Sequence, residues 1–215
     1  MAQRARRAFY RTDPVSLARR LLGCTLVRQE SGGVRLSAMI VETEAYLGVE
    51  DAAAHSYKGR RSARNESMYG PPGTAYVYFT YGMHHCFNIV AGAPGEPVAA
   101  LIRAAEPLEG VKVMLERRSL GRARRSRAPG PLPALRASDL CSGPAKLCEA
   151  FGLDRAFDGL DLAGPGSPVW IEPAAALGPE QIATSRRIGV AYAGAWARRR
   201  LRFLIRANPH VSVPA

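Results

Sequence analysis

Two glutamates and a tyrosine alternate along one short, otherwise apolar segment of the chain. Residues 39–47 read Met-Ile-Val-Glu-Thr-Glu-Ala-Tyr-Leu. In an extended strand alternate side chains share a face, so Glu42, Glu44 and Tyr46 are predicted to lie side by side. The whole chain has a formal net charge of +12, which suits polyanions. Because carboxylates repel phosphates, a carboxylate kept in such a setting is expected to serve chemistry.

The composition limits the kind of protein that the chain can be. Its 215 residues, 47% of them hydrophobic, suffice for one well-filled core, and we predict a single domain over residues 1–215. Of the 30 basic residues only Lys58, Lys112 and Lys146 are lysines. Arginine suits bidentate phosphate contact and base stacking, which makes nucleic acid the leading partner. An arginine-rich proteome, in which many folds are basic, would also explain the charge.

The cysteines and the first residues indicate an intracellular protein without a structural metal. The four cysteines show no C-x-x-C spacing, so neither a disulfide framework nor a structural zinc site is expected. Residues 1–8 are basic and lack an apolar run, which we interpret as a flexible arm. Nowhere do 18 uncharged apolar residues run together. We therefore expect a soluble, intracellular protein, located in the cytoplasm or nucleoid if its source is a bacterium.

Capping and turn residues mark the first elements. Asp13 followed by Pro14 predicts the start of a helix, which Gly23 ends. Residues 24–29 and 34–46 predict a hairpin with a Ser-Gly-Gly turn. The acidic strand is the second strand of this hairpin and is therefore expected to lie within a sheet.

A long polar stretch and a second hairpin follow. Residues 48–73 are too long for a simple connection, and such loops commonly build sites. The basic and amide residues of this stretch are His55, Arg60, Arg61, Arg64 and Asn65. Residues 74–80 and 83–90 predict the two strands of the next hairpin, with Tyr81 at or beside its tip.

The rest of the chain predicts an alternation of strands, helices and loops. We expect a strand at 98–104, a helix from 106 to about 120, a basic loop at 117–133, a helix at 144–151, and closing strands at 169–172, 187–195 and 201–207. Lys146 falls in the first turn of the later helix, whose N-terminus suits an anion. An ordinary capped helix with one exposed lysine would explain the same residues.

Blocks spread along the chain resemble one enzyme family. They read Val-Glu-Thr-Glu-Ala-Tyr-Leu-Gly, Ala-Ala-His-Ser, Tyr-Val-Tyr-Phe-Thr-Tyr-Gly-Met, Asn-Ile, Leu-Ile-Arg-Ala-Ala-Glu-Pro-Leu-Glu-Gly and Leu-Cys-Ser-Gly-Pro-Ala-Lys-Leu. In this order and spacing, from about residue 9 to residue 213, they resemble the alkyladenine (3-methyladenine) DNA glycosylase family. The resemblance implies an α+β fold, a single mixed domain around a curved, mainly antiparallel β-sheet with a protruding β-hairpin.

The resemblance also implies an activity. Members of the family flip damaged purines out of double-stranded DNA and hydrolyse them away in base excision repair, with substrates of the 3-methyladenine, 7-methylguanine, hypoxanthine and ethenoadenine class. It further implies a monomer that uses no metal or cofactor. No lysine stands where it could act as a Schiff-base nucleophile, so we expect a monofunctional enzyme that leaves an abasic site without cutting the strand.

The resemblance assigns the pocket residue by residue. It makes Glu44 the general base that activates water. The side chains and backbone groups that it places around the flipped base are Tyr46, Ala53, His55, Tyr78 and Asn88. On the pocket floor, the amide of Asn88 would exclude the N2 amine of guanine.

The resemblance also indicates how DNA would be held. Tyr81 would enter the minor groove and fill the space that the flipped nucleotide leaves. Arg103 maps near the backbone of that nucleotide. Lys146, Arg60 and Arg64 are our further candidates for contacts with phosphates.

Several neighbouring residues have plainer interpretations. We predict ordinary sheet packing for Tyr76 and Phe79. Glu42 could pair with an arginine and only shape the local field. His84 and Cys86 invite a metal hypothesis, but as a pair they lack clear third and fourth ligands.

Two departures and two other function classes remain. The family pattern has Glu where this chain has Ala195, and an aromatic residue where it has His84; both put substrate range and local stability in question.

A binding module of the same fold would bind damaged DNA without releasing a base. A metal-dependent phosphoesterase built on Glu42, Glu44 and His84 would cut strands directly and be abolished by a chelator.

Overall fold

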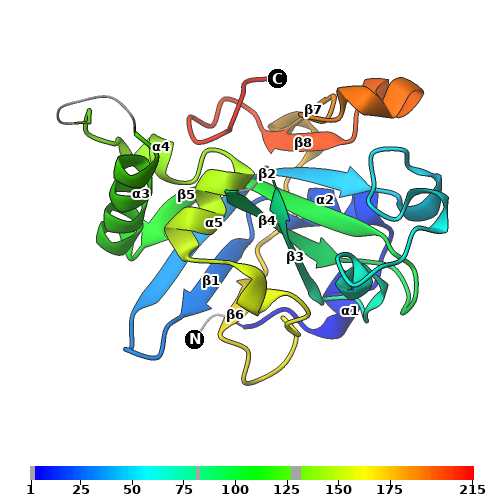
Figure 1. Cartoon of the computed structure of the whole chain (residues 1–215), viewed down its shortest axis with the longest axis horizontal. Coiled ribbons are helices and arrows are strands. Elements are labelled where there is room, and N and C mark those ends of the chain that lie inside the picture. Colours follow the sequence, from blue (N-terminus) through cyan, green and yellow to red (C-terminus); the bar gives the residue numbers. More distant parts are fainter. Residues whose placement is uncertain (1–2, 81–82, 127–131) are drawn as a thin grey trace.

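A single curved sheet forms the centre of the molecule. The structure, a computed structural model, describes residues 3–80, 83–126 and 132–215. The strands are β1 (Thr25–Gln29), β2 (Arg35–Tyr46), β3 (Ala75–Thr80), β4 (His84–Val90), β5 (Ala99–Glu109), β6 (Val169–Glu172), β7 (Ile182–Ser185) and β8 (Arg202–Ile205). Their order is β3-β4-β5-β2-β1-β6, β7 and β8 form a further pair at β2, and all the pairings are antiparallel. The expected α+β fold with a mainly antiparallel sheet is confirmed (Figure 1).

Strand β2 is the long central strand, and it changes partners along its length. Its first half pairs with β1, its second half pairs with β8 over Glu42 to Glu44, and β5 runs along its other edge. The register with β5 shifts on both sides of Glu42, as it does at a β-bulge. Residues 40–45 are all buried. The two glutamates thus lie inside the sheet, where a charge is costly unless it is paired.

Helices and short 3₁₀ segments surround the sheet. The α-helices are α1 (Arg7–Tyr10), α2 (Pro14–Leu21), α3 (Val111–Arg125), α4 (Ala137–Leu140) and α5 (Pro144–Phe151). The 3₁₀ segments are η1 (Gly48–Glu50), η2 (Tyr57–Gly59), η3 (Glu66–Tyr69), η4 (Arg155–Phe157), η5 (Pro179–Gln181) and η6 (Ala191–Arg198). Within the described ranges no helix has both the length and the apolar character needed to cross a bilayer.

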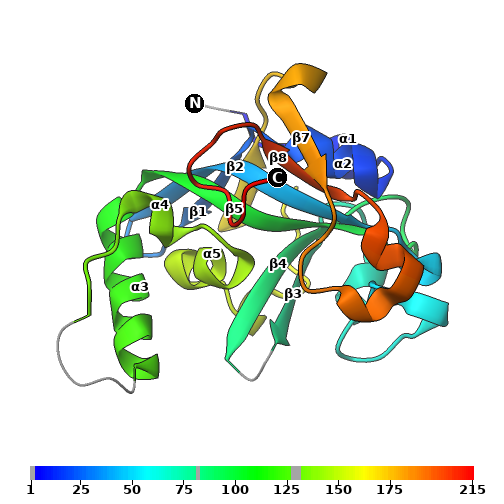
Figure 2. The same ribbon diagram turned by 90° about the horizontal axis from the view of Figure 1, so that it is seen from above.

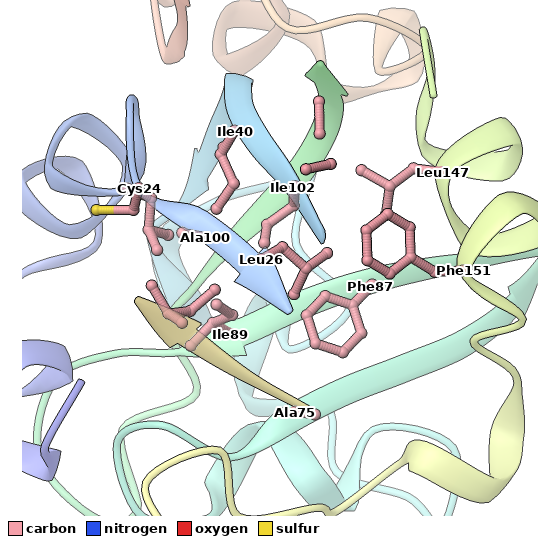
Figure 3. Close-up of a cluster of buried hydrophobic side chains, with 14 of the residues drawn as sticks. Cys24, Leu26, Ile40, Ala75, Phe87, Ile89, Ala100, Ile102, Leu147 and Phe151 are labelled. Carbon is pink, nitrogen blue, oxygen red and sulfur yellow. The ribbon is translucent and has the colours of Figure 1, made fainter. Parts of the chain in front are cut away.

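The core lies between the sheet and the helices that cover it. Figure 3 shows Phe87 of β4 beside Leu147 and Phe151 of α5, all three fully buried. Burying each such side chain contributes about 1.5–3 kcal/mol. This packing fixes α5, and hence Lys146, relative to the β3–β4 hairpin, which Figure 2 shows running away from the rest of the sheet.

The predicted start of α2 is confirmed in detail. The Asp13 carboxylate accepts hydrogen bonds from the backbone N–H groups of Val15 (3.0 Å) and Ser16 (2.9 Å), and Pro14 occupies the first helical position. The hydroxyl of Thr43 donates to the carbonyl of Ala18 at 2.7 Å. This bond ties the helix to the face of β2 opposite to the glutamates.

Two predictions between residues 98 and 133 are wrong. Strand β5 continues to Glu109, where a helix was expected from residue 106, because Glu106 and Pro107 still pair with β2. The helix begins only after Gly110, whose φ of 71° breaks the strand. Residues 117–125, predicted as part of a basic loop, form the second half of α3, since arginine and leucine are good helix formers.

A third prediction fails near the end of the chain. Residues 187–195 were expected to form a strand, but the chain there turns into η6. Gly189 and Gly194 have φ values of 77° and 57°, which no extended strand contains. The closing strand at 169–172 is confirmed, the strand expected at 201–207 is found over the shorter range 202–205, and β7 was not predicted.

The amino-terminal segment has contacts that a flexible arm would lack. The N–H of Ala5 donates to the carbonyl of Ile171 at 2.8 Å, and the Arg4 guanidinium lies 3.8 Å from the centre of the Trp170 ring. Arg7 pairs with Asp161. Residues 4–7 are therefore docked beside β6.

Candidate active site

A cavity of about 340 Å³ opens where β2, β3, β4 and β5 meet the loops. The residues around it come from these strands, from residues 53–55, from Met68 of η3, from the start of α5 and from residues 188–192. Five residues predicted for the base pocket line it, namely Tyr46, Ala53, His55, Tyr78 and Asn88. The volume is that of a pocket for a small molecule. The structure therefore brings together residues that lie up to 42 positions apart in the sequence, from Tyr46 to Asn88.

Glu44 lies directly behind the wall of this cavity. Its side chain has no exposed surface, and three groups that line the cavity contact it. The Tyr46 hydroxyl donates to Oε2 at 2.9 Å, the Ile188 N–H donates to Oε1 at 2.8 Å, and Arg103 lies 3.3 Å from Oε1. A carboxylate offers about four lone-pair positions. Among the residues that the structure describes, these donors leave one position on Oε2 for a water molecule or a proton.

Burial sets the acidity of Glu44. Loss of water around the carboxylate raises its pKa, and the nearby Arg103 charge, the Ile188 N–H and the Tyr46 hydroxyl offset this rise only in part. A raised pKa makes a carboxylate a better proton acceptor when it is ionised. Such perturbed carboxylates beside cavities are typical of active sites.

Glu42 is as deeply buried as Glu44 but accepts more hydrogen bonds, including two from guanidinium groups. Its Oε1 accepts from Arg103 Nε (2.8 Å), Arg202 Nε (2.7 Å) and the Ser212 hydroxyl (2.8 Å), and its Oε2 accepts from the Ser212 N–H (2.6 Å). Burial alone would raise the pKa of Glu42, but the Arg202 hydrogen bond and the Arg103 charge outweigh burial and lower it. The interpretation of Glu42 as an arginine partner is confirmed.

Aromatic rings also line the cavity. The Tyr76 hydroxyl and His55 Nδ1 are 2.7 Å apart, and the His55 ring stands edge-on to Tyr78 with centroids 4.5 Å apart. Burial, and then the Arg64 charge, lower the pKa of His55, so the imidazole is neutral at pH 7. Tyr76 also lines the cavity, and the prediction of mere sheet packing for it is wrong. It is two residues from Tyr78 and therefore shares its face of β3.

Asn88 and Ala53 complete the cavity with polar groups. The Asn88 side chain is buried and donates to the carbonyl of Tyr76 at 3.0 Å, so it both lines the cavity and braces the hairpin. The carbonyl of Ala53 accepts from the Tyr192 hydroxyl at 3.2 Å. A ligand that reached this wall would meet an amide and a carbonyl already held in place.

The predicted phosphate contacts fall into two groups. Arg60 and Arg64 are exposed, and Arg64 donates to the carbonyl of Phe79 beside the hairpin. Lys146 is partly exposed at the first turn of α5, where its Nζ lies 3.1 Å from the Ser142 hydroxyl. Arg103, in contrast, is buried, pairs with Glu42 and Glu44, and lines the cavity. Its predicted contact with the DNA backbone stays a prediction.

The metal hypothesis finds little support in the described part of the chain. Among those residues no three His, Cys, Asp or Glu side chains are grouped so that they could hold an ion. Cys86 lines the cavity, and burial raises the pKa of its thiol. His84 does not line the cavity. His84 and Cys86 therefore remain a pair without further ligands there.

Sequence comparisons identify the relatives of the chain. The pattern of the methylpurine-DNA glycosylase (MPG) family matches residues 8–209. The chain belongs to the methylpurine-DNA glycosylase family. It is 46% identical over 208 residues to the human DNA-3-methyladenine glycosylase, covering 95% of this chain and 66% of that protein. It is 44% identical over 208 residues to the mouse DNA-3-methyladenine glycosylase, covering 95% of this chain and 60% of that protein.

A bacterial member of the family matches along its whole length. A protein of Desulfitobacterium hafniense, provisionally named 3-methyladenine DNA glycosylase, is 44% identical over 214 residues, covering 98% of this chain and 99% of that protein. The chain thus spans less than two thirds of the length of the human and mouse relatives but nearly all of this one.

One predicted site residue of this methylpurine-DNA glycosylase family member lies outside the described part of the chain, and several residues at the site were not predicted. Tyr81, the predicted wedge, lies outside the described residues. The residues that sequence reasoning missed are Tyr76, Arg187, Ile188, Arg202 and Ser212. Period-two spacing on β3 could have found Tyr76. The others act through backbone groups or long-range pairing, for which a single sequence carries no local signal.

Proposed function

We propose that this chain is a monofunctional DNA glycosylase that excises alkylated or deaminated purines from duplex DNA. The observation that carries the proposal is the buried Glu44 carboxylate, which has one open acceptor position and stands behind an aromatic cavity. The names of the family and of its human member, methylpurine-DNA glycosylase and DNA-3-methyladenine glycosylase, support methylated purines in DNA as substrates. The activity of the whole protein and the roles of its site residues are part of this proposal.

The chemistry proposed for Glu44 is general-base catalysis. Glu44 orients a water molecule at Oε2 and takes its proton as the water attacks C1′ of the damaged nucleotide. The bond to the purine breaks through an oxocarbenium-like state, and the nearby negative carboxylate stabilises the developing positive charge on the sugar. Arg103 and the Ile188 N–H hold Oε1, which leaves Oε2 for the water.

The cavity is proposed to hold the flipped base. Flipping costs a few kcal/mol, which stacking on aromatic faces offsets, and Tyr46, His55 and Tyr78 provide those faces. A cationic alkylated purine is a good leaving group by itself, whereas hypoxanthine needs a hydrogen bond, for which the backbone near Ala53 is the candidate. Asn88 is proposed to exclude the N2 amine of guanine.

Double-stranded DNA is the proposed partner, bound by a single copy of the chain inside the cell. The net charge of +12 and the exposed Arg60 and Arg64 beside the hairpin support this partner. Tyr81 is proposed as the wedge in the minor groove. Sedimentation of the protein alone and with a short duplex would test the monomer, since a dimer in either state would contradict it.

The decisive experiment measures base release. Duplexes with a single hypoxanthine or 7-methylguanine are incubated with the protein in EDTA, and abasic sites are revealed by alkali. We expect alkali-dependent cleavage that Glu44→Gln abolishes. Tight binding without base release would favour a binding module. Strand cutting without alkali that EDTA prevents would favour the phosphoesterase.

A further inference from the structure

A buried ion pair behind the cavity joins two segments far apart in the chain. The side chains of Arg187 and Asp51 have no exposed surface, and Arg187 Nη2 donates to Asp51 Oδ1 at 2.8 Å. Arg187 Nη1 donates to the other oxygen of Asp51 and, at 3.0 Å, to the carbonyl of Ala45 at the end of β2. Neither charged residue lines the cavity. Their effect on it must therefore pass through their neighbours.

Asp51 shapes the turn that leads from β2 into the cavity wall. Its Oδ2 accepts from the Leu47 N–H at 3.1 Å, and its Oδ1 accepts from the Ala53 N–H at 3.0 Å. One carboxylate thus fixes both ends of the loop that carries Ala53. This loop would lose its common anchor if Asp51 were released from Arg187.

Arg187 fixes the facing segment. Its guanidinium lies 4.8 Å from the centre of the Tyr46 ring, a distance at which a cation attracts an aromatic face. The next residue, Ile188, provides the N–H that donates to Glu44. The Arg187 guanidinium thus braces Tyr46 directly and Glu44 through the backbone.

The two segments also meet through apolar contacts. Ala53, Val190 and Ala193 form a small buried cluster, against which Tyr46 and Trp196 pack. Figure 2 shows η6, in orange, beside the cyan loop that contains η1. The ion pair therefore stands at the base of a small unit that closes one side of the cavity.

Stability alone gives a poor account of this pair. Desolvating two charges often costs as much as their attraction returns. The Arg187 Nε, moreover, is buried without a hydrogen-bond partner among the described residues, which adds to the cost. A pair of apolar side chains could fill the same space more cheaply, but it could not hold the backbone groups of Ala45, Leu47 and Ala53 in fixed positions.

We propose that Arg187 and Asp51 are positioning residues of the glycosylase reaction, which hold the Ile188 N–H on Glu44 and the Tyr46 ring at the cavity wall. This inference rests on the function proposed above. When the pair is loosened, Glu44 loses a donor to its charged form and the water that it orients is misplaced. Both effects slow the chemical step without removing any group that touches DNA.

Several charged and titratable groups surround Glu44 and share control of its proton. They are Glu42, Tyr46, Tyr78, Cys86, Arg103, Arg187 and Arg202. Arg187 and its partner Asp51 do not line the cavity and are not hydrogen-bonded to Glu42. The pair can therefore be tested separately from the proposed base.

The test compares Arg187→Lys and Asp51→Asn with the wild type on a duplex with one hypoxanthine. Lysine keeps the charge but cannot reach all partners of the guanidinium, and asparagine keeps the shape but loses the charge. We expect the single-turnover rate to fall about tenfold to a hundredfold while the Kd for the duplex is unchanged. The acid limb of the pH–rate profile should move up by about one pH unit, since a hydrogen bond to a carboxylate is lost.

A matched control separates positioning from general stability. Arg118 is also buried and paired, with Glu149 between α3 and α5, away from the cavity. We expect Arg118→Lys to lower Tm without moving the acid limb. If Arg187→Lys and Asp51→Asn lower Tm but keep the wild-type limb and rate per folded molecule, the pair is only structural and the inference is overturned.

Two further outcomes are distinguishable. If Arg187→Lys does not fold, as judged by circular dichroism, the isosteric Asp51→Asn decides the question by the same two readouts. If the wild type releases no base from any lesion, the proposed function fails. The positioning inference fails if the wild type is active and the folded variants have the same acid limb in the pH–rate profile and the same single-turnover rate as the wild type.

Discussion

Glu42 and Glu44 are two residues apart on the same strand, and both are completely buried, yet the pKa values of their carboxyl groups shift in opposite directions. Glu42 has two guanidinium groups within 2.8 Å together with the hydroxyl and N–H of Ser212. Glu44 has one guanidinium at 3.3 Å, one N–H and one phenol. The pKa of Glu42 is lowered and that of Glu44 is raised. Residue type therefore does not decide which carboxylate can do chemistry, whereas the number of donors around it does.

The difference also separates two tasks within one strand. Glu42 holds Arg103 in place from the side away from the cavity, and Arg103 in turn reaches Glu44. Glu42, which has more donors, thus helps to position the arginine that contacts Glu44. The predictions below change one member at a time, beginning with the largest expected effect.

The largest effect is expected from Glu44→Gln. The amide has the shape of the carboxylate but cannot accept the proton, so base release should fall at least about a hundredfold. Binding of the damaged duplex should persist. Single-turnover kinetics and a binding titration on the same duplex measure both. Turnover above about a tenth of the wild-type rate would remove Glu44 from the role of general base.

The second prediction concerns Glu42→Gln. Its main effect should be on folding, because Arg103 and Arg202 lose their shared counter-charge, at a cost of about 3 kcal/mol in the free energy of unfolding. Base release per folded molecule should fall less than in Glu44→Gln. Urea unfolding at pH 7 gives the free energy. Equal losses of stability in the two variants would mean that the two sites do not differ as described.

The third prediction follows from the signs of the two pKa shifts. Because the folded pKa of Glu44 is raised, its contribution to stability is complete below about pH 4.5 and is lost as pH rises through the folded pKa. The folded pKa of Glu42 is lowered, so its contribution is present above about pH 4.5 and is lost as pH falls through the folded pKa.

Unfolding measured between pH 4 and pH 8 tests both signs. Relative to Glu44→Gln, the wild type should gain stability as pH falls; relative to Glu42→Gln, it should lose stability below about pH 4.5. The acid limb of base release should lie above pH 4.5, since only ionised Glu44 is active. A limb at or below that pH would show that Glu44 is not the group that titrates.

The smallest expected effect is a change in the salt dependence of DNA binding, which should differ between exposed and buried arginines. The affinity for duplex DNA should fall steeply between 50 mM and 200 mM salt, by about tenfold or more. Arg64→Ala should reduce the slope of log K against log salt by about one, because Arg64 is exposed beside the hairpin. Arg202→Lys should leave the slope unchanged, since the buried Arg202 side chain is hydrogen-bonded to Glu42. A slope that is flat for the wild type would contradict DNA as the partner.

The sequence predicted local features well and the difference between the two glutamates poorly. Strand alternation put Glu44 beside Tyr46, and the Asp13-Pro14 cap and both hairpins followed from short-range rules. The partners that distinguish Glu42 come from β5 and β8, 61 and 160 residues further along. Their contact depends on how the sheet curls, which no local pattern contains.

The remaining errors have physical causes of the same kind. Residues 187–195 look like a strand in composition, but two glycines with positive φ turn the chain toward the cavity. The extension of β5 to Glu109 comes from pairing with β2, which outweighs the local tendency to start a helix. The error at Tyr76 is different, because its spacing of two residues from Tyr78 already indicated that both side chains lie on the same face of the strand.

The contacts of Ser212 with Glu42 also bear on how the protein is made. Ser212 follows Glu42 by 170 residues, and Arg202 follows it by 160. On the ribosome, β2 emerges long before either partner, and the nascent chain grows by about 5–20 residues per second. For many seconds of synthesis Glu42 is without most of its donors, and Arg103 has no fixed position beside Glu44. A polypeptide still in translation therefore lacks the ordered Glu42–Arg103–Glu44 network, and the site proposed for base release is completed only when the last residues of the chain have been added.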